Sequence, residues 1–264
     1  WAQAAGEFER VAATSKDPKL ARDALWQAAE LHEKATEAGG KPARALATKT
    51  YERYLAQNPD PLDRALEARY RMARIAKADG NSTRELALMK EIVQADQRAG
   101  GARTDRTRFL GASAALAMAE PAFNEYRKVA LVEPLAKQLK LKKAKMEEVL
   151  KAYSVASEYG VADVTTAATF RTATLYQDFG KALLTSQRPK KLSKAELEQY
   201  NVLLEEQAFP FEEKATELHE VNTRRAAKGI YDEWVKSSFA ALRELRPVRY
   251  GKAERSEGVI DAIR

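Results

Sequence analysis

Cysteine is absent from this 264-residue chain, and its absence excludes disulfide scaffolds, thiolate metal sites and cysteine nucleophiles. Histidine is scarce as well, with only His32 and His219. Each is followed by glutamate, but neither has the second histidine that the zinc-binding H-E-x-x-H pattern requires. The sequence therefore predicts no metal and no cofactor. We expect His32 to be a helix-packing residue and His219 to be a partly exposed residue of a helix.

Long apolar runs are also missing. The longest stretches, such as residues 111–119, are far shorter than the roughly 20 residues that a membrane-spanning helix needs. Any membrane contact is therefore expected through partners or through an anchor that was removed. The chain begins at Trp1, with no basic segment and no cleavage site after it, so we expect that a leader and further N-terminal chain preceded it.

Glycine and proline are few, at 12 and 9 residues, whereas Ala, Leu, Glu, Lys and Arg dominate. These dominant residues lose least on entering a helix. Hydrophobic residues make up 45% of the chain, which is enough for a sizeable core. The net charge of +7 arises from 45 basic and 38 acidic residues. This modest excess permits acidic proteins, nucleic acid or anionic lipid as partners, and it selects none of them.

Apolar residues recur three and four positions apart along nearly the whole chain, and no segment alternates as a half-buried strand would. The pattern predicts an all-α fold of about a dozen helices. Helix starts are indicated by Asp-Pro pairs and capping boxes, and helix ends by glycines. The predicted starts are Asp17-Pro18, Asp60-Pro61, Ser82 with Glu85, and Ser193 with Glu196; the predicted ends are Gly39-Gly40, Gly80, Gly100-Gly101 and Gly160.

The connections between these helices are short, so consecutive helices should form antiparallel hairpins. Residues 20–60 carry the clearest unit. Leu25, Ala28, Ala29 and His32 occupy the large, medium, small and aromatic places of a first helix, and Ala47, Tyr51 and Pro59 have the A-x3-F…P spacing of a second. Small residues let paired helices approach while large ones fill the groove beside them. The segment at residues 51–61 closely resembles the second helix and exit turn of tetratricopeptide-repeat proteins.

Later units keep only parts of this spacing, so the resemblance implies a divergent right-handed tetratricopeptide-like solenoid of helix hairpins. Residues 98–108 interrupt the array with Gly100-Gly101 and four arginines. We place a domain boundary there. The prediction is an N-terminal set of repeats over residues 1–99, and a C-terminal set over residues 100–264 that continues from the first.

Four C-terminal segments carry a more specific resemblance. They are residues 149–160, 164–170, 203–215 and 229–234. Together they are similar to the large periplasmic tetratricopeptide proteins that accompany TonB-type or Tol-type energy-transducing systems, gliding machinery included, in Gram-negative bacteria. The resemblance implies a periplasmic scaffold that links an inner-membrane motor to envelope or outer-membrane components. It brings no catalytic residue and no small-molecule substrate.

Motifs that suggest catalysis are incomplete. Gly180-Lys181 lacks the earlier glycine and the following Ser or Thr of a phosphate-binding loop. Asp178-Phe179-Gly180 stands without any other kinase element. Carboxylates flank Phe209-Pro210-Phe211, where we expect a helix to start and to favour negative charge. These carboxylates are Glu205, Glu206, Glu212 and Glu213, and we interpret them as solvated charge.

A lysine run is the sharpest charge asymmetry in the chain. It consists of Lys137, Lys140, Lys142, Lys143 and Lys145. As a binding patch it could meet acidic headgroups, an acidic partner or phosphates. We favour the simpler interpretation, the exposed face of a helix that ends near Leu141, where the helix dipole favours cations. No aromatic residue is interleaved with these lysines, so they do not form a stacking platform for single-stranded nucleic acid.

A helical solenoid usually binds its partners on a concave surface built from the first helix of each pair. The candidates on that surface are Trp26, Glu30, Tyr70, Arg74, Lys77 and Phe170. Packing between repeats is the alternative role for each of them, and it weighs at least equally for Trp26 and Phe170.

The predicted function is a non-enzymatic protein-binding scaffold of a periplasmic envelope complex, linking a TonB/Tol-like motor to periplasmic or outer-membrane proteins in transport or gliding. A cytoplasmic location stays open. The alternative function is a helical repeat that binds nucleic acid or an acidic partner, with affinity that falls steeply with salt. An enzyme with a site between helices is a third hypothesis that no set of residues supports.

Overall fold

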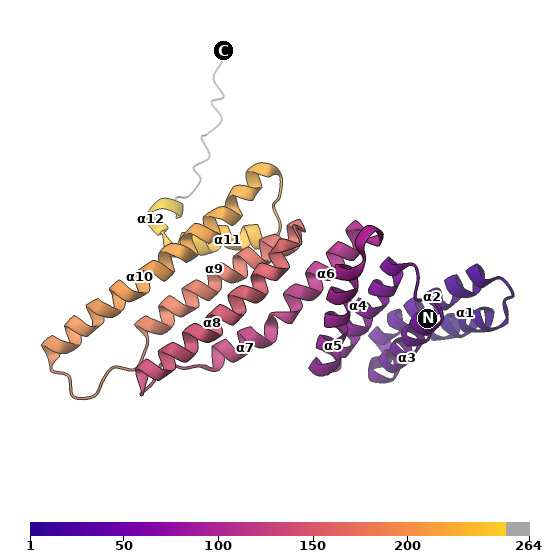
Figure 1. Cartoon of the computed structure of the whole chain (residues 1–264), viewed down its shortest axis with the longest axis horizontal. Coiled ribbons are helices and arrows are strands. Elements are labelled where there is room, and N and C mark those ends of the chain that lie inside the picture. The colour runs from indigo at the N-terminus through magenta and orange to yellow at the C-terminus, as the bar shows by residue number, and fades with distance from the viewer. Residues whose placement is uncertain (252–264) are drawn as a thin grey trace, which may run out of the picture. The chain divides into compact units, whose positions relative to one another are not determined.

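A computed structural model describes residues 1–251 of the chain (Figure 1). The described part is helical and contains no strand, which confirms the prediction of an all-α fold. It divides into two compact units, and the division of the chain falls between Pro121 and Ala122. Within residues 1–251, no helix is both long enough and apolar enough to cross a bilayer.

The first unit contains helices that follow one another through short connections. They are α1 (Ala2–Thr14), α2 (Pro18–Lys34), α3 (Thr36–Gln57), α4 (Leu62–Ala78), α5 (Ser82–Arg98), the 3-10 turn η1 (Gly100–Ala102) and α6 (Asp105–Met118). Each α-helix packs against the next, and α4 also packs against α6. This chain of neighbours is what the short connections predict.

The predicted division at Gly100 lies inside this unit rather than at its edge. Residues Gly100–Ala102 form a turn between two helices of one core. Leu110 and Ala114 of α6 are buried in the same cluster as Leu88 and Ile92 of α5. The glycine pair therefore turns the chain without ending a domain, because α6 must fold back to cover the apolar face of α5.

The core of the first unit contains the helix residues that the repeat spacing selected, whereas Pro59 of the exit turn is exposed. Leu25, Ala28, Ala29 and His32 of α2 are buried, and so are Ala47, Tyr51 and Tyr54 of α3. The break expected at Gly39-Gly40 is present, since Gly40 has the positive φ of 55° that separates a short first segment of α3 from the main helix.

Two predicted helix starts differ from the structure by one residue. Pro61, not Asp60, occupies the N-cap of α4. At α5 the cap is Asn81, whose Oδ1 accepts a hydrogen bond from the Arg84 backbone N–H at 3.0 Å, and Ser82 is already helical. The carbonyl oxygen of an Asn side chain serves this role as well as a serine hydroxyl does. The caps predicted at Asp17 and at Ser193 with Glu196 are confirmed.

The corrected cap of α5 leads to a specific prediction. Replacing Asn81 by Ala removes the acceptor for the Arg84 N–H, so we expect the free energy of unfolding to fall by about 1 kcal/mol. Ser82→Ala removes no cap, so it should change stability by less than about 0.5 kcal/mol. Urea denaturation followed by circular dichroism measures both. Equal losses in the two variants would show that the cap is assigned to the wrong residue.

The second unit is described from Ala122 to Gly251. It contains all but the first two residues of α7 (Glu120–Lys128), followed by α8 (Leu135–Glu158), α9 (Ala162–Leu184), α10 (Lys194–Arg224), the 3-10 turn η2 (Arg225–Lys228), α11 (Glu233–Leu245) and the short α12 (Pro247–Tyr250). Figure 1 shows α9 between α8 and α10, and α9 packs against both. Helix α11 packs on α10 and also touches α9.

The helix expected to begin at Phe209-Pro210-Phe211 does not begin there. Pro210 lies inside the 31-residue helix α10, although proline removes one backbone hydrogen bond from a helix interior. Packing on α9 holds the segment helical: Phe179 and Phe211 have ring centroids 4.5 Å apart, and a Cβ added to Gly180 would lie 3.5 Å from the Ala208 carbonyl oxygen. Phe179-Gly180, the coincidental kinase-like pair, is therefore a point of close helix packing.

Candidate functional site

The candidate site is a charged cleft in the first unit where α2 meets α4. Its volume is about 390 Å³, and it is lined by Glu30, Glu33, Lys34, Thr36, Glu37, Arg71 and Arg74. The residues come from the C-terminal half of α2, the first turn of α3 and the C-terminal half of α4. Acidic and basic side chains line it together, so the cleft can pair with both signs of charge.

Arg71 of α4 forms the floor of this cleft. Its guanidinium contacts three carboxylates: Nη2 lies 3.1 Å from Glu30 Oε1, Nη1 lies 3.1 Å from Glu33 Oε2, and Nε lies 3.0 Å from Glu67 Oε1. The planar group offers its donors in a fixed fork, which suits several carboxylates at once. Arg106 of α6 donates from Nε to the other oxygen of Glu67 at 2.9 Å. The network therefore joins α2, α4 and α6.

Tyr51 connects α3 to the same network. Its hydroxyl donates to Glu33 Oε2 at 2.7 Å and accepts from Arg71 Nη1 at 3.3 Å. Burial, helped by the negative charge of Glu33, raises the pKa of the Tyr51 hydroxyl, so this group stays protonated and keeps donating. Tyr51 and the three glutamates all contact Arg71, so these contacts hold the side chains at the floor of the cleft in place.

Trp26 belongs to the core, and its ring packs against the guanidinium of Arg71. Its ring meets Tyr54 and Tyr51 edge to face, with centroids 5.1 Å and 5.8 Å away. The guanidinium carbons of Arg71 and Arg64 lie 5.6 Å and 5.5 Å from its centroid, within the range of a cation–π contact. Trp26 is only 8% exposed, so its role is packing, the alternative that the sequence left open.

Two of the predicted partner-binding residues come together in this cleft, and the others lie outside its lining. Glu30 and Arg74 both line it. Tyr70 is partly buried against the core. Lys77 is exposed, with its Nζ 3.7 Å from Glu85 Oε1. Phe170 lies in the second unit, packed at 5.4 Å from His219 and 5.5 Å from Trp234 between ring centroids.

Sequence reasoning missed Arg71, Glu33 and Glu67, which organise the cleft. A signal for them exists, since Glu67, Arg71 and Arg74 are four and then three residues apart and share a face of one helix. Glu30 and Glu33 are likewise neighbours on the preceding first helix. Helices α2 and α4 are the first helices of two consecutive hairpins, and each carries a stripe of charged residues. Such stripes predict that opposite charges meet where the two helices pack.

The rim of the cleft carries three charged side chains besides those of its floor. Within residues 1–251, no group of three or more His, Asp or Glu side chains is arranged to hold a metal ion. Arg74, Lys34 and Glu37 stand at the rim with no ion-pair partner in the described part of the chain, although Lys34 Nζ lies 5.4 Å from the centroid of the Trp1 ring. The rim charges therefore differ from the floor charges, which are already paired with one another.

Comparison with known proteins assigns no family. No family model matches the chain, and no curated protein matches it. One similar solved structure comes from work titled "Computational Design of Self-Assembling Cyclic Protein Homooligomers"; it is 16% identical, with a TM-score of 0.29, over 93% of this chain and 89% of that one.

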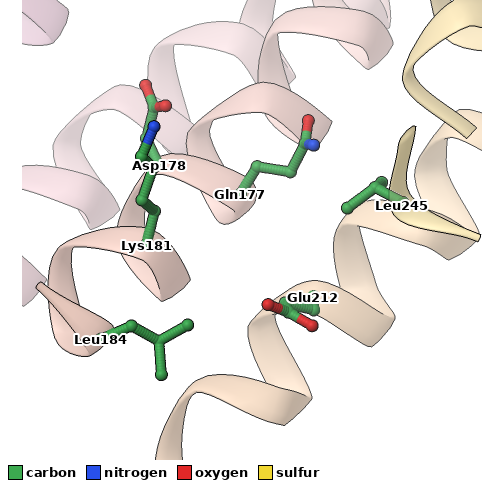
Figure 2. A pocket seen from close by; sticks show the side chains of 6 residues that line it. All are labelled: Gln177, Asp178, Lys181, Leu184, Glu212 and Leu245. Atoms are coloured by element: carbon green, nitrogen blue, oxygen red, sulfur yellow. The ribbon is translucent and has the colours of Figure 1, made fainter. Parts of the chain in front are cut away.

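The second unit has a smaller cleft of about 340 Å³ between α9 and α10, closed at one side by Leu245 of α11 (Figure 2). Asp178 and Glu212 line it, but Figure 2 shows the Asp178 carboxylate pointing away from Glu212. Burial raises the pKa of Asp178, against the opposing effect of Arg127, Lys142 and Lys181. The two carboxylates do not form the facing pair that acid–base catalysis uses.

The lysine run differs from its prediction in two ways. Helix α8 begins at Leu135, so these lysines lie in its first half and the predicted helix end near Leu141 is wrong. Lys142 is buried at 5% exposure, and its Nζ donates to the backbone carbonyls of Val129 at 2.8 Å and Tyr126 at 3.3 Å. Lys145 pairs with Glu148 at 2.8 Å, whereas Lys137, Lys140 and Lys143 are exposed.

Proposed function

We propose that this chain is a non-enzymatic helical-repeat scaffold that binds a segment of another protein in the charged cleft of its first unit. The observation that carries the proposal is the combination of a floor locked by Arg71 with unpaired charges at the rim. A preorganised floor lowers the entropic cost of binding, because its side chains do not have to be ordered by the ligand. The unpaired rim charges supply specificity.

The arrangement of the rim indicates the kind of segment that would fit. Arg74 and Lys34 are positive and Glu37 is negative, so a suitable ligand carries an acidic side chain next to a basic one. A ligand with a single sign of charge would face like charge on part of the rim, which is costly at an interface. The ligand chemistry is therefore that of a mixed-charge peptide or helix.

The fold and setting of the proposal rest on the sequence. The buried places of α2 and α3 follow the tetratricopeptide spacing, which supports a divergent right-handed solenoid of that type. The C-terminal segments between residues 149 and 234 resemble periplasmic tetratricopeptide proteins of TonB/Tol-like and gliding systems. They support a periplasmic partner in an envelope complex, and fractionation of the native cells tests this part. Recovery of the chain with cytosolic markers alone would contradict the periplasmic setting and leave the cleft proposal standing.

Site-specific photocrosslinking in the native cells tests the cleft directly. A photoreactive residue in place of Glu37 or Arg74 should yield discrete adducts with protein partners. The same residue in place of Lys49 of α3 or Lys90 of α5, both exposed on second helices, should yield few. The adducts at position 37 should also decrease when Arg74→Glu reverses the rim charge.

Adducts of equal strength at all four positions would contradict a localised site. Nucleic acid recovered at the cleft positions, with binding that falls steeply as salt rises, would instead favour the alternative function. An exposed charge such as Arg74 contributes little to folding, so loss of adducts in Arg74→Glu would report lost binding. Circular dichroism of the purified variant verifies that it is folded.

A further inference from the structure

The first half of α10 exposes an apolar face to solvent. Val202, Leu203 and Phe209 are 53%, 55% and 54% exposed. Val202 and Phe209 are seven residues apart, so they lie on one side of the helix, opposite the buried residues Leu204 and Ala208 that face α9. Three acidic residues accompany this apolar stripe, namely Glu198, Glu205 and Glu206.

The chain covers the continuation of the same stripe with its own C-terminal helices. One and two heptads beyond Glu206, at Glu213 and Glu220, the stripe meets arginines. Arg246 pairs with Glu213, and Arg249 Nη1 lies 3.0 Å from Glu220 Oε1. Tyr250 also donates to Glu220. The second half of α10 therefore has a basic helical partner along this stripe, and the first half has none within residues 1–251.

A face with the opposite charge lies on the other edge of the same unit. Ala136, Leu139 and Ala144 of α8 line a shallow apolar groove of about 460 Å³, together with Lys140 and Lys143. Lys137 is exposed on the same helix, and Glu147 stands at the far end of the groove. This face points away from Met146, Val149 and Tyr153, through which α8 is buried.

Both faces carry unpaired charge. In the described part of the chain, no ion pair involves Lys137, Lys140 or Lys143, and none involves Glu198, Glu205 or Glu206. Lys137 also lies in the first turn of α8, where the helix dipole opposes a cation. Local structure therefore does not account for a lysine cluster here, whereas an acidic partner would.

We propose that α10 of one copy of this chain packs its exposed first half against the outer face of α8 of a second copy. Apolar side chains meet in the centre, and Glu198, Glu205 and Glu206 of one copy pair with Lys137, Lys140 and Lys143 of the other. The contact repeats, between copies, the kind of pairing that Arg246 and Arg249 make with α10 inside one chain.

Because α9 separates α8 from α10 (Figure 1), the two faces lie on opposite edges of the unit and cannot meet within one copy. The contact is therefore heterologous: the α10 face of each copy contacts the α8 face of the next copy. Such contacts produce closed rings or open chains, according to the rotation between successive copies. Each copy in the interior of the assembly uses both faces.

Sedimentation velocity of the full chain over a range of concentrations tests the proposal. The wild type should associate beyond a dimer at low salt and dissociate in about 0.5 M NaCl, where charges are screened beyond roughly 4 Å. A variant with Lys137, Lys140 and Lys143 all replaced by Glu should weaken association at least about tenfold, because like charges would then face each other. A variant with Glu198, Glu205 and Glu206 replaced by Lys should lose it equally.

Mixing these two variants is the decisive step. At a concentration at which each variant alone is monomeric, an equal mixture should associate, because the intact α10 face of the first fits the intact α8 face of the second. A control with Lys16, Lys19 and Lys90 changed to Glu alters the net charge equally on exposed sites of the first unit and should associate as the wild type does. Circular dichroism confirms that every variant is folded.

Three outcomes would overturn the proposal. If the wild type stays monomeric at every concentration, the proposed contact between copies does not form. Association that survives the Lys→Glu changes does not use α8. A monomer that binds anionic vesicles through Lys137, Lys140 and Lys143 shows that these lysines serve a lipid surface instead.

Discussion

Replacing Arg71 by Ala should destabilise the first unit by about 2–3 kcal/mol. The change leaves Glu30, Glu33 and Glu67 close together without the cation that all three contact. Removing one partner of a fully buried charge network costs about 3–5 kcal/mol; Arg71 is 26% exposed, so solvent reduces this cost. Urea denaturation, with hydrogen-exchange mass spectrometry on peptides from α2 to α6, measures the loss.

Two controls identify the source of the Arg71 effect. Arg69→Ala on the same helix removes an ion pair with Glu91 at 3.1 Å, whose carboxylate is half exposed, and should cost less than about 1 kcal/mol. Adding Glu30→Gln to Arg71→Ala should recover part of the loss, because it removes one of the repelling charges. A double variant that is less stable than Arg71→Ala would show that packing, and not charge, carries the effect.

The second large effect is a dependence of stability on pH that originates at His219. The sequence suggested a partly exposed side chain, but His219 is fully buried between α9 and α10, with Nε2 3.2 Å from Gln177 Oε1 and Phe170 packed on its ring. Its Nδ1 is buried with no hydrogen-bond partner in the described part of the chain. Burial lowers the pKa of His219 from 6.5 to about 4, so the folded state holds the ring neutral.

The direction of the pH effect follows from proton uptake. Between pH 6.5 and pH 4 the unfolded chain binds a proton at His219 that the folded chain does not. The stability from a neutral His219 is therefore complete above pH 6.5 and decreases as the pH falls toward 4, by about 3 kcal/mol in total. Peptides of α9, α10 and α11 should show this decrease by hydrogen exchange across the pH range.

His219→Gln is the matched control for this prediction, since glutamine can still bond to Gln177 but cannot titrate. Acidic residues lose stability at low pH in both proteins, so the difference between the wild type and the variant isolates the histidine. The difference should change by about 3 kcal/mol between pH 6.5 and pH 4. Parallel pH profiles would show that the folded state accepts the proton on His219 without cost.

The cleft and the self-association surface lie in different units and are proposed to bind different partners. The cleft lies wholly in the first unit and would be occupied by a different protein. The α8 and α10 faces lie wholly in the second unit and would be occupied by another copy. Charge changes at Arg74 and at Lys140 therefore separate the two proposals, because each should affect one measurement and leave the other unchanged.

Local patterns determined much of what could be predicted. The repeat spacing selected Ala47 and Tyr51, which are buried, and the capping box at Ser193 and Glu196 located the start of α10. Both signals depend on residues a few positions apart. The start of α8 was missed. Its N-cap is Pro134, and it has neither a capping side chain nor an acidic residue in its first turn, so proline was the one local signal at Leu135.

The misplaced residues share a different cause. Lys142 is buried because the carbonyls of Tyr126 and Val129, which are 16 and 13 residues away, accept hydrogen bonds from its ammonium group. His219 is buried because Gln177, 42 residues away, meets it from α9. Arg71 reaches Glu33 across 38 positions. None of these partners can be chosen from sequence spacing within one helix.

By itself, therefore, the sequence determined that the chain is helical and which side of most helices is apolar, since both follow from the spacing of residues along one element. Only the tertiary structure decided which charged side chains meet and which polar groups are buried. Both depend on how separate helices pack against one another. The free energy of a buried charge or an unpaired lysine depends on the neighbouring groups that this packing places beside it. The cleft around Arg71 and the exposed faces of α8 and α10 both result from that packing.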